Sequence, residues 1–252
     1  MSDGAEKYWD KTKRPLPNLF FVLPLLLAYE LGVLLIGESN GYSVRSAADA
    51  WLRWTLANIG IESTWVVPGL IVAVLIGWQL YVKDPWVLEL PVFLGMIGES
   101  IGLGAGLVLL GELQYQLYVS LTQPPAAAAG ALDQLAMEPW FVQSVAYLGA
   151  GIYEEAIFRL MLLPALLWVA SKVQPSPKLA VTIAVVLSSL AFASAHYIGP
   201  GAEPFDNFTF TFRVVAGLFF SSVFVLRGFG LAVGAHAAYD ILVAVVGLHV
   251  LS

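Results

Sequence analysis

The sequence predicts an all-α protein, a polytopic bundle of about seven to eight transmembrane helices. Hydrophobic residues make up 59% of the 252 residues and charged residues only 12%, whereas soluble domains average about 25% charged residues. Several apolar runs also approach the roughly 20 helical residues that cross a hydrocarbon core. Helices are expected in these runs because lipid cannot satisfy the backbone polar groups of an open strand.

Composition also excludes several classes of protein. The chain has no cysteine, so disulfides, thiolate nucleophiles and cysteine-bound zinc are ruled out. It has no basic stripe typical of a nucleic-acid partner, and membrane lipid is the surrounding that the composition predicts. The first 17 residues are polar and basic, and no small-residue cleavage pattern follows the first apolar run. We therefore expect a retained anchor and not a signal peptide.

Seven apolar runs are expected to span the membrane. Their limits are Asn18–Gly37, Trp65–Val82, Trp86–Gly111, Pro139–Ser171, Leu179–Tyr197, Phe208–Leu226 and Phe229–Val250. The fourth run is too long for one perpendicular helix, so either Pro164 kinks it or a break after Arg159 splits it and gives an eighth element. The segment Ser43–Ile59 mixes tryptophan with arginine, which indicates either an interfacial amphipathic helix or a partly buried loop helix. The proline- and alanine-rich stretch Gln114–Met137 is expected to be an exposed loop.

The positions of Lys and Arg predict how the bundle is oriented. Most of these residues fall on one side of a seven-span arrangement, namely Lys7, Lys11, Lys13, Arg14, Lys83, Lys172, Lys178 and Arg227. Only Arg45 and Arg53 fall in loops on the other side. The positive-inside rule therefore predicts a multi-pass integral membrane protein with a cytoplasmic N-terminus.

The most informative motif is Glu154-Glu155-Ala156-Ile157-Phe158-Arg159, three charged residues in an otherwise apolar run. Glu155 and Arg159 have the i, i+4 spacing that allows an ion pair on one helix face. Glu154 points about 100° away, so it has no partner in its own helix and faces a neighbour. A free carboxyl in a dry environment becomes a better base, although a purely structural ion network is an open alternative.

Two further motifs place histidines in apolar runs. Phe192 precedes His196 by one helical turn near the end of the fifth run. His236 precedes Asp240 by four residues in the last run, so both lie on one face and Asp240 can hold the His236 ring in one tautomer. Each polar group would be unfavourable alone in lipid, and the penalty falls if they converge. Counting residues along the helices places Glu154 and His236 at similar depths and His196 nearer the outer side.

Together the three motifs resemble those of the intramembrane CAAX-protease and bacteriocin-processing family, which includes the Ras-converting type of CAAX prenyl endopeptidase. Its pattern of Glu-Glu-x-x-x-Arg, Phe-x-x-x-His and His-x-x-x-Asn is matched in order, over about residues 139–245. There are two departures. Leu160 stands where the family often has glycine, and Asp240 stands where it commonly has asparagine. Because an ionised aspartate cannot donate a hydrogen bond, Asp240 must be protonated or must orient His236.

The resemblance implies hydrolysis of a peptide bond in a peptide or protein substrate, prenylated or membrane-inserted. It implies that Glu154 activates water with the help of His196, that Glu155 and Arg159 fix the geometry, and that His236, with Asp240, stabilises the oxyanion. We accordingly divide the chain into a cytoplasmic segment (1–17), N-terminal membrane helices (18–138) and a catalytic membrane core (139–250).

A zinc-dependent version of this site is the alternative to a site without a cofactor. Glu154, His196 and His236 are suitable zinc ligand types, with water as a fourth ligand. The chain lacks the His-Glu-x-x-His helix that commonly supplies two ligands, and the resemblance implies hydrolysis without an obligatory metal. We therefore expect no metal.

Two other classes of function are left open by the sequence. Glu30 and Glu99 also lie within apolar runs, and they would suit a small proton-coupled transporter, or else bond neighbouring helices. Glu99 stands beside Gly98, Gly102 and Gly106, a spacing that predicts a close-packing face. No internal repeat of the kind common in transporters is present. A catalytically inert membrane scaffold or immunity protein is the second alternative.

Overall fold

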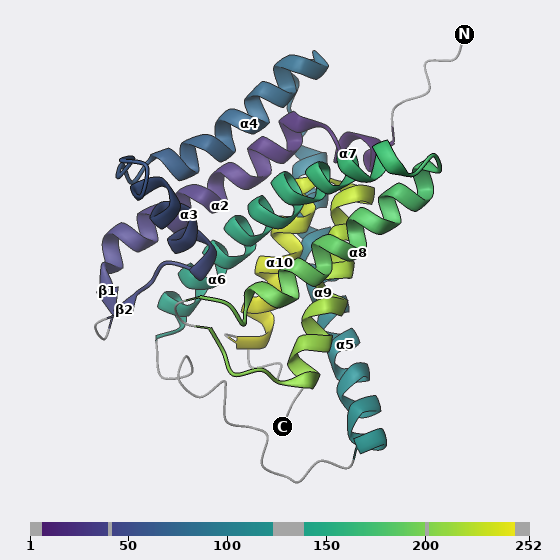
Figure 1. Cartoon of the computed structure of the whole chain (residues 1–252). Helices are drawn as coiled ribbons and strands as arrows, with labels where there is room; N and C mark the ends of the chain where they lie inside the picture. The colour runs from purple at the N-terminus through teal and green to yellow at the C-terminus, as the bar shows by residue number, and fades with distance from the viewer. Residues whose placement is uncertain (1–6, 40–41, 123–138, 200–201, 245–252) are drawn as a thin grey trace.

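The computed structural model describes residues 7–39, 42–122, 139–199 and 202–244, and these form a helical bundle (Figure 1). The N-terminal elements are α1 (Tyr8–Lys11), α2 (Pro15–Ile36), β1 (Glu38–Ser39), β2 (Tyr42–Ser43), α3 (Ala47–Ala57), α4 (Val66–Val82) and α5 (Leu90–Thr122). The C-terminal elements are α6 (Trp140–Glu155), the π-helix η1 (Ala156–Leu162), α7 (Leu163–Val173), α8 (Pro177–Ala195), α9 (Asn207–Arg227) and α10 (Phe229–Ala244). The antiparallel β1–β2 hairpin is too short to change the all-α class.

Local sequence explains where the helices begin and end. Pro15 starts α2, a position where its missing N–H leaves no bond unmade. The Ser46 hydroxyl caps α3 by accepting a hydrogen bond from the Asp49 N–H, and Asp206 caps α9 in the same way through Thr209. Gly37 and Gly228 end α2 and α9 with positive φ angles of 67° and 100°, which glycine adopts without steric strain.

All seven apolar runs predicted to cross the membrane are helical in the described residues. Five helices there are long and apolar enough to span it by length and composition: Pro15–Ile36, Leu90–Thr122, Trp140–Val173, Pro177–Ala195 and Asn207–Arg227. The other two predicted spans correspond to the shorter apolar helices Val66–Val82 and Phe229–Ala244. These findings, with the predicted interfacial segment folded as α3, describe an integral membrane protein.

The structure corrects the sequence-based limits in three places. The third span was predicted to end at Gly111, but α5 continues to Thr122, so the first part of the predicted Gln114–Met137 loop is helical. The rest of that loop, 123–138, lies outside the described residues, as does the last span beyond Ala244. The fourth run is not broken after Arg159. It runs from Trp140 to Val173 as one helical path that loosens into the π-helix η1 just before Pro164.

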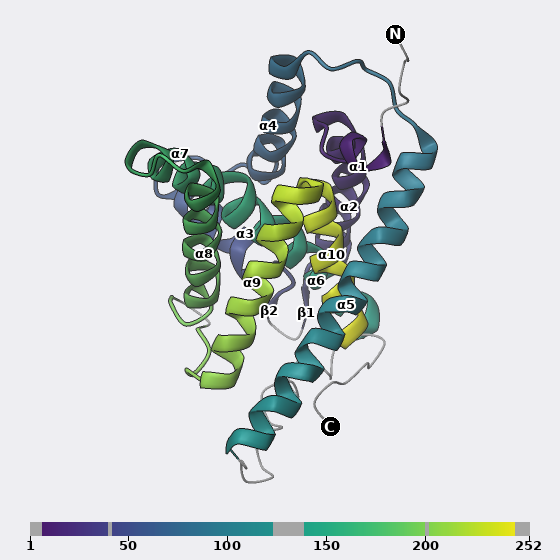
Figure 2. The same cartoon turned by 90° about the vertical axis from the view of Figure 1, so that its right-hand side faces the viewer.

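Helix α10 lies at the centre of the bundle (Figure 2). It packs against α5, α6, α9 and α2, and its residues from Phe229 to Ala237 are all buried. Two glycines allow this close packing. A Cβ added at Gly151 of α6 would come within 2.9 Å of the Ala237 backbone nitrogen, and one at Gly104 of α5 within 2.8 Å of the Tyr239 nitrogen. The three glycines predicted to form a close-packing face on α5 (Gly98, Gly102 and Gly106) face open space instead.

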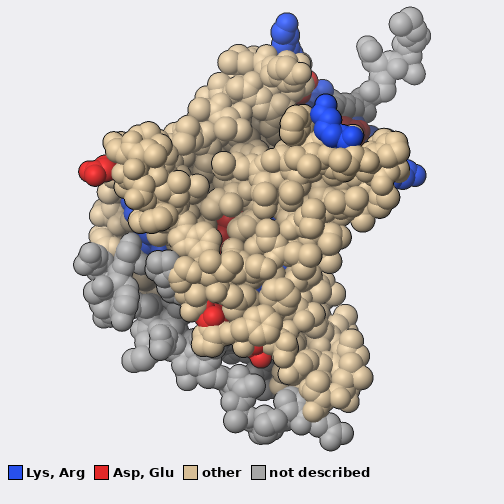
Figure 3. All heavy atoms as spheres, in the orientation of Figure 1, with Lys and Arg blue, Asp and Glu red and all other residues tan. Residues whose placement is uncertain are grey.

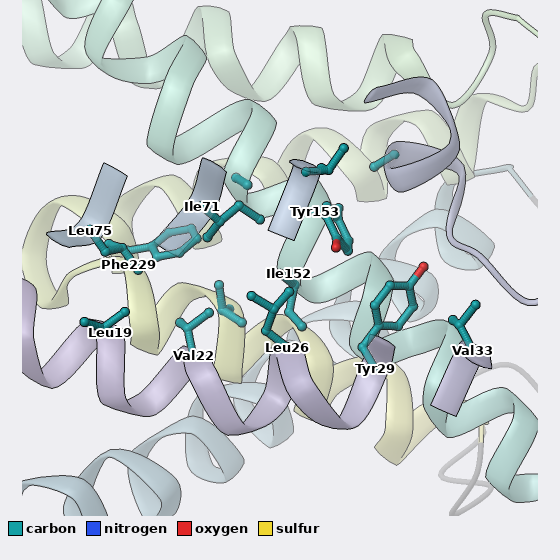
Figure 4. Packing of buried hydrophobic residues seen from close by; sticks show 14 residues of the cluster. Leu19, Val22, Leu26, Tyr29, Val33, Ile71, Leu75, Ile152, Tyr153 and Phe229 are labelled. Atoms are coloured by element: carbon teal, nitrogen blue, oxygen red, sulfur yellow. The ribbon is translucent and has the colours of Figure 1, made fainter. Parts of the chain in front are cut away.

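A second group of contacts joins the N-terminal helices to α6. Leu26 and Tyr29 of α2 point towards Ile152 and Tyr153 of α6 (Figure 4). The Tyr29 and Tyr153 rings meet edge to face with their centroids 5.4 Å apart. α4 closes the same apolar cluster from the other side through Ile71 and Leu75. The end of α6 that carries Glu154 is thereby fixed from both halves of the chain.

Glu30 and Glu99, the two other glutamates that the sequence analysis placed within apolar runs, bond neighbouring helices. Glu30 of α2 accepts hydrogen bonds from the Tyr153 hydroxyl of α6 and from Arg53 Nη2 of α3, the latter at 2.9 Å. Glu99 of α5 pairs with Arg227 at the end of α9, at 2.6 and 2.8 Å. The sequence left two alternatives for these glutamates, a role in a proton-coupled transporter or bonds to neighbouring helices. The ion pairs favour the second, because each glutamate has a cationic partner on another helix.

Charge is concentrated at the ends of the bundle. In Figure 3 many of the visible Lys and Arg side chains gather at the upper end, near the turn between α7 and α8, above a broad surface with few charged side chains. That end contains the N-terminal helix α1 and the junction of α9 with α10 (Figure 1). The distribution agrees with the arrangement of Lys and Arg predicted from the sequence.

Candidate active site

All six candidate residues lie at the meeting point of α6, η1, α8 and α10. Glu154 and Glu155 are the last two residues of α6, and Arg159 lies in the middle of η1. His196 directly follows the end of α8. His236 and Asp240 are one turn apart on α10. Segments separated by tens of residues in the chain are thus brought into one cluster.

Glu154 is the point where the two histidines meet. Its Oε2 atom lies 3.9 Å from Nε2 of His196 and 3.8 Å from Nε2 of His236. The Glu154 side chain is 15% exposed and that of His196 is 23% exposed. One carboxylate oxygen therefore faces two imidazole nitrogens at a partly exposed position.

The tautomer of His196 is set by the backbone. Its Nδ1 lies 2.9 Å from the Phe192 carbonyl oxygen, and since a carbonyl can only accept, Nδ1 carries the hydrogen. Burial lowers the pKa of His196 below its ordinary value, and the Glu154 carboxylate offsets this only in part. The neutral ring therefore presents the lone pair of Nε2 towards Glu154.

Glu155 is fully buried and holds two partners at once. Its Oε1 accepts a hydrogen bond from Arg159 Nη1 at 3.0 Å, which confirms the ion pair predicted from their spacing. The same oxygen lies 2.8 Å from His236 Nδ1. Arg159 also donates through Nη2 to the Gly217 carbonyl of α9, at 3.2 Å. This chain of bonds ties α6, η1, α9 and α10 together at the site.

The ring of His236 is oriented by Glu155 and not by Asp240. The sequence offered Asp240 as the residue that holds the ring, but Nδ1 is bonded to Glu155. Asp240 instead lies on the opposite edge, where its Oδ2 is 3.6 Å from Nε2. Nε2 thus faces both Asp240 and Glu154. The spacing of His236 and Asp240 on α10 correctly indicated that the two side chains lie close together. It did not reveal that Glu155, on another helix, lies closer to the His236 ring than Asp240 does.

Aromatic rings enclose the charged groups. Phe220 of α9 stacks on His236 with an interplanar angle of 13° and a centroid distance of 4.4 Å. Phe192 of α8 covers the Arg159 guanidinium at 4.4 Å and meets the His196 ring edge to face. Such contacts stabilise a desolvated cation and restrict the rings. Phe192 belongs to a motif that is visible in the sequence. Phe220 could not be singled out, because nothing in the apolar α9 distinguishes one phenylalanine from another.

The π-helix after Glu155 has its own support. The carbonyl oxygen of Phe158 accepts a hydrogen bond from the Ser188 hydroxyl of α8, at 2.8 Å. Ser188 is fully buried, and sequence analysis did not identify it. The only available signal was a hydroxyl within an apolar run. π-helical turns often occur at functional sites, and this one immediately follows the two glutamates.

Counting residues from the sequence placed His196 at a different depth from Glu154, and the structure corrects this. The helical path from Glu154 reaches a short turn after Val173, and α8 then returns from Pro177. Glu154 and His196 lie at similar distances along the chain from this turn, so a helical hairpin brings them to the same level. The error came from assigning the fourth run the limits of a single span.

The arrangement also bears on the zinc alternative. Glu154, His196 and His236 were the ligand set considered from sequence. Within the described residues, no group of three or more His, Asp or Glu side chains is arranged as a metal site.

Comparison with known proteins gives one match. Residues 136–242 match the family model of the type II CAAX prenyl endopeptidases, Rce1-like. No curated protein and no solved structure matches the chain. The matched stretch contains all six residues of the cluster, whereas α1 to α5 lie outside it. The stretch of the chain that forms this cluster is therefore similar to the type II CAAX prenyl endopeptidases of the Rce1-like family.

Proposed function

We propose that this protein is an intramembrane endopeptidase in which Glu154 activates a water molecule. The observation that carries the proposal is the position of one Glu154 oxygen within 4 Å of the Nε2 atoms of both histidines. A carboxylate and a neutral imidazole facing one partly exposed point are the groups that general-base hydrolysis needs. The family match supports a protease of the CAAX type.

In this mechanism the water lies between Glu154 and His196. The water donates one hydrogen to Glu154 Oε2 and the other to the His196 Nε2 lone pair. As its oxygen attacks the substrate carbonyl, Glu154 takes the first proton and the carbonyl π electrons move to oxygen. The protonated Glu154 then passes this proton to the amide nitrogen, the oxyanion re-forms the carbonyl, and the C–N bond breaks to give a carboxylic acid and an amine. The released amine takes the proton of the acid, so the products leave as a carboxylate and an ammonium.

His236 is placed to stabilise the oxyanion. Its Nδ1 hydrogen is used by Glu155, so a hydrogen on Nε2 requires the doubly protonated ring. Carboxylates at 2.8, 3.8 and 3.6 Å surround the ring and favour that cation by Coulomb attraction. Donors aimed at an oxyanion contribute on the order of 3 kcal/mol each in enzymes. Glu155 and Arg159 act as positioning residues, since each contacts other side chains and neither is exposed.

We further propose prenylated or membrane-inserted peptides as substrates, and a cytoplasmic N-terminus. The apolar surface of the helices offers such peptides a route through lipid, and the family name refers to prenylated C-terminal motifs. The cytoplasmic N-terminus rests on the clustering of Lys and Arg at one end of the bundle. Hydrolysis is proposed to run without a metal.

The direct test is cleavage of a fluorogenic farnesylated peptide by purified protein. We expect Glu154→Gln and His196→Ala to lower kcat by about 10²- to 10⁴-fold, the usual range for a lost acid–base group. Glu62→Gln, a change at an exposed carboxylate, is the matched control and should leave the rate unchanged. Full activity in both site variants would sink the mechanism.

Metal dependence needs a separate measurement. Purified protein is dialysed against a strong chelator, its metal content is measured, and its cleavage rate is compared with that of untreated protein. We expect the dialysed protein to contain less than about one-tenth of a metal ion per protein molecule, on the order of contamination. Its kcat should equal that of the untreated protein. A loss of activity that zinc restores would favour the zinc alternative, with Glu154, His196 and His236 as ligands.

A further inference from the structure

Arg213 is a partly buried cation near His196 that neither the sequence motifs nor the mechanism uses. It lies in the first half of α9, and its side chain is 15% exposed. Its Nη2 donates to Glu203 Oε1 at 2.7 Å, and its Cζ lies 5.2 Å from the centre of the Tyr197 ring. Its Nη1 is buried and has no hydrogen-bond partner among the described residues.

Arg213 is fixed to the chain segment that contains His196. Tyr197, on which the guanidinium rests, directly follows His196. The N–H of Glu203 donates to the His196 carbonyl at 3.1 Å, so both partners of Arg213 are attached at that residue. The positive charge of Arg213 also contributes to the lowered pKa of His196. Arg213 therefore lies near the segment that follows α8 and contains His196.

The pairing of Arg213 is incomplete. A guanidinium presents N–H donors along two edges and binds carboxylates through parallel hydrogen bonds. Glu203 uses one nitrogen, and since its own side chain is 49% exposed, water weakens its attraction. A buried N–H donor without a partner is unfavourable by about 1–3 kcal/mol. An anion arriving at Nη1 would remove this penalty.

We propose that Arg213 binds the C-terminal carboxylate of the peptide substrate. This rests on the proposed function, because it assumes hydrolysis at Glu154. A C-terminal Cys-aliphatic-aliphatic-X motif ends in a free carboxylate, and every peptide bond inside it lies within three residues of that end. Three extended residues span about 10 Å, and Arg213 is held through Tyr197 and Glu203 to the chain segment that contains His196.

Binding of a C-terminal carboxylate would distinguish this site from the site of a general intramembrane protease. An enzyme that cuts in the middle of a membrane-inserted segment has no use for a carboxylate-binding group near the scissile bond. Arg213 instead makes the chain end part of what is recognised. It is then a specificity-determining residue, which contacts the substrate but takes no part in proton transfer.

The test compares two farnesylated peptides that differ only in a C-terminal acid or amide. We expect wild-type protein to cleave the acid with a kcat/KM about 10- to 100-fold higher, the range for one hydrogen bond to a charged group. Arg213→Gln should lose this preference, because its rate on the acid falls to the level of the amide. Arg213→Lys should keep part of the preference, and Glu203→Gln should keep all of it.

Three outcomes would overturn the inference. The first is equal cleavage of the acid and the amide peptide by the wild-type protein, a result that can be obtained without any variant. An equal fall on both peptides in Arg213→Gln and Arg213→Lys would show a structural role only. Full preference in Arg213→Gln would place the carboxylate elsewhere. If the wild type cleaved neither peptide, or Glu154→Gln remained active, the proposed function itself would fail and the inference with it.

Discussion

Glu154 and Glu155 are neighbours in sequence with opposite surroundings. Glu155 is fully buried and shares one oxygen between Arg159 and His236. Glu154 projects from a different side of the helix to a partly exposed position between two imidazoles. The 100° step between successive helical residues produces this separation. One carboxylate is therefore suited to hold the site together and the other to accept a proton.

Asp240 gives a prediction at the scale of one residue. It lies 3.6 Å from His236 Nε2 but does not orient the ring. An amide has the same shape and can donate a hydrogen bond to an oxyanion, which an ionised carboxylate cannot. We therefore expect Asp240→Asn to keep or raise kcat/KM on the farnesylated peptide, and Asp240→Ala to lower it at least about tenfold.

The comparison is read from steady-state rates of purified variants with equal thermal stability. If Asp240→Asn lost as much activity as Glu154→Gln, the reaction would need the negative charge of Asp240. A second base would then have to be added to the mechanism.

At the scale of elements, the contact between α6 and α10 controls the geometry of the site. Glu155 of α6 bonds His236 of α10, and four residues before Glu155, Gly151 lets the two backbones approach. The π-helix that follows is fixed to α8 through Ser188. Small shifts between these helices therefore act directly on the distances around Glu154.

Gly151→Ala is expected to separate α6 from α10. The added Cβ would lie 2.9 Å from the Ala237 nitrogen, and backbone contacts of this kind cannot be relieved by a side-chain rotation. Overpacking typically destabilises by about 1–3 kcal/mol. We expect a lower unfolding temperature in detergent and a fall in kcat/KM of about tenfold or more.

Gly102→Ala on α5 is the matched control. No atom lies within 4 Å of the added Cβ, and alanine favours a helix over glycine by about 1 kcal/mol. Unchanged activity and equal or higher stability are expected. If both variants behaved alike, close packing at Gly151 would not be what positions the site.

At the scale of the whole molecule, the N-terminal helices outside the matched family region support the site. Tyr153, next to Glu154, donates to Glu30 of α2, and Glu30 is in turn paired with Arg53 of α3. At the other end, Arg227 pairs with Glu99 of α5 and donates to the Trp9 carbonyl of α1, at 2.9 Å. The two halves of the chain are thus joined by the Tyr153–Glu30 hydrogen bond at one place and by the Arg227–Glu99 ion pair at another.

The orientation of the whole bundle can be tested by labelling. The chain has no cysteine, so an introduced thiol is unique. Asn58 after α3 and Ser171 near the end of α7 are both exposed, and the positive-inside rule places them on opposite sides. A membrane-impermeant maleimide should label Asn58→Cys but not Ser171→Cys in intact cells, and both after permeabilisation. The reverse pattern in intact cells would invert the proposed topology.

The sequence by itself determined the class of protein and the residues that meet. Low charge and long apolar runs require a helical membrane bundle, and the penalty for isolated charges in lipid predicts that Glu154, His196 and His236 converge. The Glu155–Arg159 pair followed from helical spacing alone. These conclusions depend on local periodicity and on the solvent, and both can be read along one chain.

Only the tertiary structure decided how these residues share their bonds. Glu155 bonding His236, Phe220 stacking on the His236 ring and Arg213 resting on the Tyr197 ring are contacts between segments far apart in the chain. The length of α5 and the level of His196 depended on how far each helix extends before it turns. Periodicity gives the face of a helix but not its neighbour, since many helix pairs satisfy the same pattern of small and apolar residues. The choice among them comes from the packing of the complete bundle around α10.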